Sequence, residues 1–235
     1  GQDVSICPGS CAVLTATGGI SYLWNNSATN ATINVCPTNT TVYTVTVTDI
    51  NGCTDSDEVT VSLYPLPQAN AGPDVSICEA ECTNLNASGG ISYIWNNQET
   101  TSTINVCPSI TTTYSVTVTD NNGCTDSDEV TVTIILAPTA DAGADASVCE
   151  GENYTLNGNA SNYSAINWTG GDGNFDNTGI LNPTYIPGPN DISAGSVTLT
   201  LNVIGNLPCN PVADSMILTI DPLPIAHAGP DATII

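Results

Sequence analysis

The chain has 235 residues and carries 23 acidic side chains, but it has no lysine, no arginine and a single histidine, His227. Without lysine or arginine it cannot bind nucleic acid through phosphate contacts, and attraction to an anionic membrane surface is disfavoured. Each carboxylate must be solvated, capped by backbone N–H groups or neutralised by a metal. A hydrophobic fraction of 40%, rich in Val, Ile and Thr, still predicts a folded, β-rich chain.

Two close copies of one sequence module follow each other from the N-terminus. The segments that begin at Gly1 and Gly72 match without a gap: GQDVSIC matches GPDVSIC, GGISYLWNN matches GGISYIWNN, and VTVTDINGCTDSDEVTV matches VTVTDNNGCTDSDEVTV. A third, diverged copy begins at Gly143 with GADASVCEGENYTLNG. Such repetition indicates an array of small structural units. We therefore predict module one (1–66), module two (72–137), module three (142–224) and a final segment (225–235).

Short alternating segments within module one predict the strands of a β-sandwich. The pair Asn51-Gly52 predicts a hairpin turn. Trp24 and its counterparts Trp95 and Trp168 suit the buried aromatic residue of an immunoglobulin-like core. No segment stands out with the period of a helix. The predicted strands are Asp3–Ile6, Val13–Thr17, Ser21–Trp24, Thr32–Val35, Tyr43–Thr48 and Glu58–Leu63.

Proline-rich linkers join the modules. They are PLPQANAGPD (65–74), LAPTADAGAD (136–145) and PLPIAHAGPD (222–231). Because proline restricts φ and favours extended backbone, these linkers act as semi-rigid spacers, which predicts an extended rod. The last residues, 228–235, repeat the opening of a module. They are either the first strand of a further module or an added strand on a neighbouring subunit.

Ten cysteines at regular spacing indicate disulfides and an oxidising compartment, since the C-x2-C pairs of zinc modules are absent. Module three keeps counterparts of Cys7 and Cys53 but lacks those of both Cys11 and Cys36. A module that loses cysteines without leaving a free thiol should lose a bonded pair. The competing assignment is Cys7–Cys11 with Cys36–Cys53. The predicted disulfides are Cys7–Cys53, Cys11–Cys36, Cys78–Cys124, Cys82–Cys107 and Cys149–Cys209.

Acidic and amide side chains crowd the hairpin DINGCTDSD, its copy in module two, and GGDGNFD in module three. Alternating oxygen ligands on a tight glycine turn suit calcium, the only cofactor that the sequence suggests. The alternative is ordinary turn chemistry, in which these side chains bind their own backbone and face water. The candidate calcium ligands are Asp49, Asn51, Asp55, Asp57, Asp120, Asn122, Asp126, Asp128, Asp172, Asn174 and Asp176.

Several motifs carry a resemblance to a known class of proteins. The PLP-x-A-x-AGPD opening, the Y-x-W strand and the TTxYTVTVTDxNGC run resemble repeats of giant cell-surface adhesins of Bacteroidetes, including gliding-motility adhesins exported by the type IX route. ANAGPD and GADASVCEGENYTLNGNAS are similar to the opening of PKD-type modules, which share the immunoglobulin-like sandwich. The resemblance implies an all-β fold of tandem immunoglobulin-like (PKD-like) modules, secreted and located at the cell surface. Asp214-Ser215-Met216 resembles a short O-glycosylation signal with Ser215 as acceptor.

Catalysis is not expected, because His227 lies in a linker and no module offers a base within reach of a nucleophile. The sequence predicts a non-catalytic structural segment of an extracellular adhesin, stalk or filament. Its expected partners are neighbouring modules or subunits of the same fibre, without direct membrane insertion. One alternative is a polymerising fibre subunit joined by strand addition through 228–235. The other is a module that binds surface glycans or proteins, with stacking aromatic residues drawn from Tyr22, Tyr93, Tyr163 and Tyr185.

Overall fold

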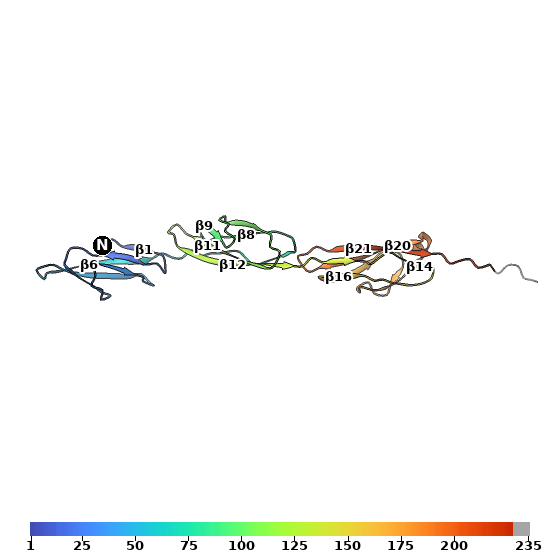
Figure 1. The fold of residues 1–235 in the computed structure, drawn as a ribbon, viewed down its shortest axis with the longest axis horizontal. Helices are drawn as coiled ribbons and strands as arrows, with labels where there is room; N and C mark the ends of the chain where they lie inside the picture. Colours follow the sequence, from blue (N-terminus) through green and yellow to red (C-terminus); the bar gives the residue numbers. More distant parts are fainter. Residues whose placement is uncertain (228–235) are drawn as a thin grey trace, which may run out of the picture. The chain divides into compact units, whose positions relative to one another are not determined.

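The computed structural model describes residues 1–227, and strands dominate this part of the chain. Each four-stranded sheet is built from the strands of a single module. Strands of all three modules are labelled in Figure 1. The chain divides into two compact units, and the predicted module boundaries stay a prediction. Unit one comprises Gly1–Val75, Thr83–Val106 and Thr112–Val132, and unit two comprises Ser76–Cys82, Cys107–Thr111 and the residues from Thr133 onward.

Module one is a sandwich of a four-stranded and a two-stranded sheet. The larger sheet has the order β1-β6-β5-β3, and β2 pairs with β4 in the smaller one. The first strand runs parallel to the last, so that Val4 faces Val61 and Ile6 faces Leu63, whereas the other neighbours are antiparallel. This order, with a tryptophan on the third strand, is that of an immunoglobulin-like sandwich. The strands are β1 (Val4–Ile6), β2 (Ala12–Thr15), β3 (Ser21–Trp24), β4 (Thr32–Val35), β5 (Thr41–Thr48) and β6 (Thr54–Leu63).

The core of module one lies between these two sheets. Trp24 is buried there, and its indole N–H donates to the carbonyl of Asn30 at 3.0 Å. Tyr43 and Val45 on β5 are buried beside it, with Val47 packed against the same cluster. The alternation predicted for this strand is therefore confirmed. The last strand begins at Thr54, earlier than predicted, because pairing with β5 continues up to the turn.

Module two repeats this arrangement with β7-β12-β11-β9 in one sheet and β10-β8 in the other. Trp95 occupies the position of Trp24, is 1% exposed, and donates its indole N–H to the carbonyl of Thr101 at 3.0 Å. The strands are β7 (Val75–Cys78), β8 (Thr83–Asn86), β9 (Ser92–Trp95), β10 (Thr103–Val106), β11 (Thr112–Thr119) and β12 (Thr125–Ile135).

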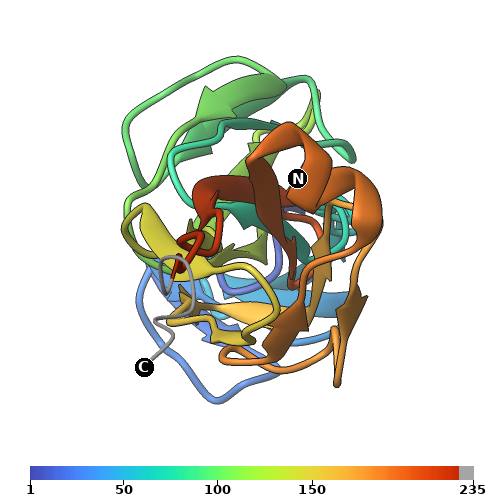
Figure 2. The same cartoon turned by 90° about the vertical axis from the view of Figure 1, so that its right-hand side faces the viewer.

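Module three keeps the same large sheet, β14-β21-β20-β17, around a buried Trp168, and adds shorter strands. It also contains the one helix found within residues 1–227, α1 (Pro189–Ala194), which ends at Gly195 with φ of 75° and appears as the orange coil in Figure 2. Six residues are too few to show a helical period, so the sequence did not predict it. The strands are β13 (Thr139–Asp141), β14 (Ala146–Cys149), β15 (Tyr154–Thr155), β16 (Asn159–Ser161), β17 (Tyr163–Thr169), β18 (Asn174–Phe175), β19 (Thr184–Ile186), β20 (Ser196–Gly205) and β21 (Val212–Asp221).

The prediction of an all-β, immunoglobulin-like fold is confirmed by these sheets and their strand order. In the part of the chain that the structure describes, no helix is long and apolar enough to cross a membrane.

Replacing Trp95 with alanine should lower the free energy of unfolding by about 3–5 kcal/mol, because it removes a fully buried indole and leaves a cavity. The adjacent residue on β9, Ile94, is 59% exposed and serves as the matched control. Ile94→Ala should change stability by less than about 0.5 kcal/mol. Urea unfolding followed by circular dichroism measures both variants. Equal losses for the two would contradict the assignment of Trp95 to the core.

Candidate functional site: disulfide-linked junctions between modules

Of the four disulfides within residues 1–227, two lie within modules and are those predicted. Cys11 bonds to Cys36, and Cys82 bonds to Cys107, each with 4.2 Å between the Cα atoms. Ala12 pairs with Val35 across the small sheet. Cys11 directly precedes Ala12, and Cys36 directly follows Val35. Each of these disulfides therefore closes one end of a two-stranded ladder.

The other two disulfides connect successive modules. Cys7 of module one bonds to Cys124 of module two, with a Cα–Cα distance of 5.3 Å and a sequence separation of 117 residues. Cys78 of module two bonds to Cys209 of module three, with 4.9 Å and a separation of 131 residues. The predicted disulfides Cys7–Cys53, Cys78–Cys124 and Cys149–Cys209 are therefore wrong. Cys53 and Cys149 are unbonded and exposed.

The strand order explains why these cysteines cannot pair within a module. Because β1 runs parallel to β6, Cys7 follows Ile6 at the end of the ladder where Leu63 lies, whereas Cys53 precedes Thr54 at the opposite end. Ten residues of strand separate the two ends, roughly 33 Å at 3.3 Å per residue. A disulfide needs Cα atoms within about 7 Å.

In all three modules these two cysteines lie at opposite ends of the large sheet, and we call them the first-strand cysteine and the hairpin cysteine. The first-strand cysteines follow or end the first strand of the large sheet, and the hairpin cysteines lie in the turn before its last strand. Each junction disulfide joins the first-strand cysteine of one module to the hairpin cysteine of the next. The first-strand cysteines are Cys7, Cys78 and Cys149, and the hairpin cysteines are Cys53, Cys124 and Cys209.

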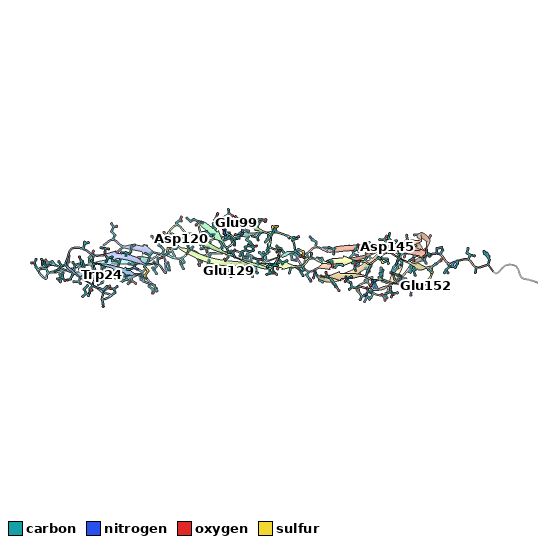
Figure 3. All side chains as sticks on the ribbon, in the orientation of Figure 1. Trp24, Glu99, Asp120, Glu129, Asp145 and Glu152 are labelled. Atoms are coloured by element: carbon teal, nitrogen blue, oxygen red, sulfur yellow. A yellow bond between two sulfur atoms is a disulfide. The ribbon has the colours of Figure 1, made fainter. Side chains whose placement is uncertain are left out.

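A carboxylate shapes the turn that presents the hairpin cysteine. Asp120, labelled in Figure 3, accepts the backbone N–H groups of Asn122 at 2.8 Å and Cys124 at 2.9 Å. Burial opposes ionisation of Asp120, but these N–H groups outweigh it and lower the pKa of the carboxyl group. In module one the backbone N–H of Cys53 lowers the pKa of Asp49 in the same way. The turns themselves are those predicted from the Asn-Gly pairs.

The linker between modules one and two is held by two further carboxylates of module two. Asp126 accepts the backbone N–H of Ala69, and Asp128 accepts that of Ala71, both at 2.9 Å. The N–H of Ala71 lowers the pKa of Asp128. In unit two the equivalent contact joins Asp214 to the N–H of Ala142 at 2.8 Å. These aspartates therefore bind the backbone that precedes their module.

The aspartate of each G-x-D opening supports the last strand of its own module. Asp3 accepts the N–H of Thr60, Asp74 that of Thr131, and Asp145 that of Ile217, at 2.8, 2.8 and 2.7 Å. Asp145 is labelled in Figure 3. Because the chain has no lysine or arginine, backbone N–H groups bind these carboxylates in their place.

The acidic loop of module three forms a similar network around the start of α1. Asp172 accepts the N–H groups of Asn190 and Asp191 at 3.1 Å. Asp191, which is buried and was not singled out from the sequence, accepts the Tyr185 hydroxyl and the N–H of Gly188. Burial and the hydrogen bond to Asp191 raise the pKa of Tyr185 well above its ordinary value. The carboxylates of this loop therefore order the helix start.

Most of the residues predicted as calcium ligands accept hydrogen bonds from backbone N–H groups. Asn51 and Asn122 donate their side-chain amides to Asp49 and Asp120, and Asp176 accepts the N–H of Thr184 at 2.9 Å. Asp55 accepts the N–H of Ser56, Asp57 accepts the N-terminal ammonium group, and Asn174 lies in β18 opposite Ile186. Within residues 1–227 no three His, Cys, Asp or Glu side chains gather as a metal group would require. Calcium binding stays a prediction.

The remaining sequence candidates lie apart from the junctions. Tyr185 is fully buried, so the expectation that it could stack on a sugar is wrong. Tyr22 and Tyr93 are half-buried and donate their hydroxyls to the carbonyls of Gly19 and Gly90, and Tyr163 is exposed on β17. Ser215 is exposed on β21 with its hydroxyl 2.8 Å from that of Thr200. Its glycosylation stays a prediction, as does the absence of a catalytic role for His227.

No protein-family model matches the chain, and no curated protein sequence matches it. Among solved structures, the titin I-band fragment I67–I69 is similar, with a TM-score of 0.45 and 12% identity over 95% of this chain and 96% of that one. Three N-terminal domains of the bacteriophage RB49 Highly Immunogenic Outer Capsid protein give a TM-score of 0.44 and 14% identity, covering 93% of this chain and 96% of that one. The immunoglobulin-like assignment rests on the strand order of each module, and these likenesses add no further argument.

Replacing Asp128 with asparagine should lower the free energy of unfolding at pH 7 by up to about 1 kcal/mol, because the linker N–H loses a charged acceptor. A lowered pKa means that this stabilisation is present above the ordinary carboxyl pKa near 4 and is lost as pH falls through the folded value. Variant and wild type should therefore converge in acid.

The matched control is Glu129→Gln, which removes the same charge one residue along β12, on the opposite face. Thermal melts between pH 2 and 7 measure both variants. If the stability of Asp128→Asn and of the wild type changed with pH to the same extent, the linker contact would be excluded as the source of the pH dependence.

Proposed function

We propose that the chain is a non-catalytic structural segment of an extracellular adhesin, stalk or filament, whose modules are covalently locked to one another to resist extension. The observation that carries this proposal is the pair of disulfides between successive modules, Cys7–Cys124 and Cys78–Cys209. A domain that needs only internal stability is served by a disulfide within itself. A bond between neighbours adds resistance to their separation.

These disulfides limit how far the chain can be stretched. The first closes a loop over residues 8–123 and the second closes one over residues 79–208, so neither interval can be drawn out in full. The two loops overlap within module two, where Cys82–Cys107 shortens the connection further. A pulling force therefore passes through three disulfides and a small part of the backbone, even when every module is unfolded.

Location outside the cell is supported by the same chemistry. Disulfides persist in oxidising compartments and are rare in reducing ones. The acidic surface, with 23 carboxyl groups and no lysine or arginine, gives trypsin-like proteases no cleavage site. The resemblance of the chain's motifs to repeats of Bacteroidetes surface adhesins supports secretion by the type IX route and attachment at the cell surface.

The alternatives need other features. Glycan or protein binding would call for an exposed aromatic platform, and of the tyrosines considered for it Tyr163 is the exposed one. Polymerisation by strand addition through 228–235 lies outside the described residues. Neither alternative explains why two junctions are cross-linked at equivalent positions. The expected partners are therefore neighbouring modules or subunits of the same fibre.

Single-molecule pulling on the two ends of the chain should reach a maximum extension of roughly 200 Å in oxidised protein, at about 3.5 Å per residue plus about 5 Å per disulfide. After reduction the same chain should extend to about 820 Å, which is the internal control. Disulfides confined within modules would give roughly 300 Å instead, because both linkers would then lie in the path of force. That value would contradict the proposed locking of neighbours.

A further inference from the structure

Cys53 and Cys149 are left over from the pattern that the junctions establish. Cys149 is a first-strand cysteine, and both other first-strand cysteines bond forward to the next module. Cys53 is a hairpin cysteine, and both other hairpin cysteines bond back to the preceding module and are buried, at 1% and 4% exposure. Cys53 and Cys149 are exposed and unbonded. Each therefore occupies a position whose counterparts are bonded to another module.

The end of module two shows what surrounds a bonded hairpin cysteine. There the incoming linker lies against the module. The carbonyl oxygen of Gln68 is so close to Gly89 that it would lie 1.8 Å from a Cβ atom on this glycine. Asn70 and Ser88 exchange two backbone hydrogen bonds, of 3.1 and 2.9 Å. Asp126 and Asp128 accept the linker N–H groups described above. A bonded junction therefore consists of a disulfide and of a linker that is hydrogen-bonded to the following module.

The same end of module one is open. A hollow of about 280 Å³ lies beside Cys53, and its lining includes the counterparts of the module two residues that hold the linker. A Cβ atom on Gly18, the counterpart of Gly89, would meet nothing within 4 Å. Asp57 accepts the N-terminal ammonium group, and Asp55 accepts the N–H of the adjacent Ser56, so neither holds a linker N–H group. The counterparts in the lining are Thr17, Gly18, Cys53, Asp55 and Asp57.

We propose that Cys53 and Cys149 are the two halves of a further junction of the same kind. Cys149 bonds the hairpin cysteine of a following module, and Cys53 bonds the first-strand cysteine of a preceding module whose linker fills the hollow. The segment PLPIAH (222–227) repeats PLPQAN (65–70), so the chain carries a linker of the required sequence after module three. The inference does not depend on the mechanical role proposed above.

The bond forms by thiol–disulfide exchange with a small disulfide such as oxidised glutathione. The thiolate of one cysteine attacks glutathione disulfide and releases one glutathione, and the second cysteine then attacks the mixed disulfide and releases another. Two thiols become one disulfide, and their two electrons and two protons leave with two molecules of glutathione. The partner module can belong to a second copy of this chain or to a longer chain, because both offer the same thiol.

The first experiment tests separate copies. The variants Cys53→Ser and Cys149→Ser are each incubated alone, and together, in a glutathione redox buffer and analysed by non-reducing electrophoresis. The junction predicts a disulfide-linked dimer in the mixture and none in either variant alone, because each variant keeps only one half of the junction. Dimers of equal yield from Cys53→Ser alone would show non-specific pairing through Cys149 and would overturn the proposal.

The second experiment tests a partner module in the same chain. A tandem protein joins residues 1–228 directly to a second copy of residues 1–235, so that the second Gly1 takes the place of Gly229. Proteolysis without reduction should recover Cys149 of the first copy bonded to Cys53 of the second. The control carries Cys53→Ser in the second copy and should expose one additional thiol to alkylation.

The two experiments together separate the outcomes. A bond in the mixture assigns the partner to a second copy, and a bond in the tandem protein alone assigns it to a neighbouring module of one chain. Free Cys149 of the first copy and free Cys53 of the second copy in the oxidised tandem protein would overturn the proposal, provided that the other junctions of this protein have formed. The Cys7–Cys124 disulfide within each copy shows whether the other junctions have formed.

Discussion

The parallel pairing of the first strand with the last is the constraint on which the rest of each module depends. It places the first-strand cysteine at one end of the ladder and the hairpin cysteine at the other, as with Cys7 beside Leu63 and Cys53 before Thr54. Had β1 been antiparallel to β6, the two thiols could have met within the module. Because they cannot, each becomes available to a neighbour, and the disulfide framework extends along the array.

A chain without lysine or arginine must stabilise its carboxylates in another way, and the backbone does so here. Asp120 orders the turn that presents a hairpin cysteine, Asp128 holds the incoming linker, and Asp145 supports the last strand of its own module. Backbone N–H groups lower the pKa of Asp120 and Asp128 and so keep these two carboxyl groups ionised, and the contact with Asp128 holds the linker against the following module. Asp120 and Asp128, which the sequence suggested as calcium ligands, therefore serve the junction by accepting backbone N–H groups.

The sequence predicted what depends on local pattern and missed what depends on the relation of distant strands. Alternation and Asn-Gly turns located the strands of module one, and the absence of cysteine counterparts in module three identified the Cys11–Cys36 pair correctly. The same argument failed for Cys7 and Cys53, because it assumed that every bond closes within one module. The parallel direction of β1 was the missing information, and no local pattern encodes it. The buried Asp191 was missed because a six-residue helix has no visible period.

Mapping of the disulfides in the unreduced protein tests the central claim most directly. Trypsin has no site in this chain, so pepsin digestion in acid, which also suppresses disulfide exchange, followed by mass spectrometry is the suitable method. The account predicts a linked peptide pair that contains Cys7 and Cys124, and a second pair that contains Cys78 and Cys209. Recovery of Cys7 bonded to Cys53 would contradict it.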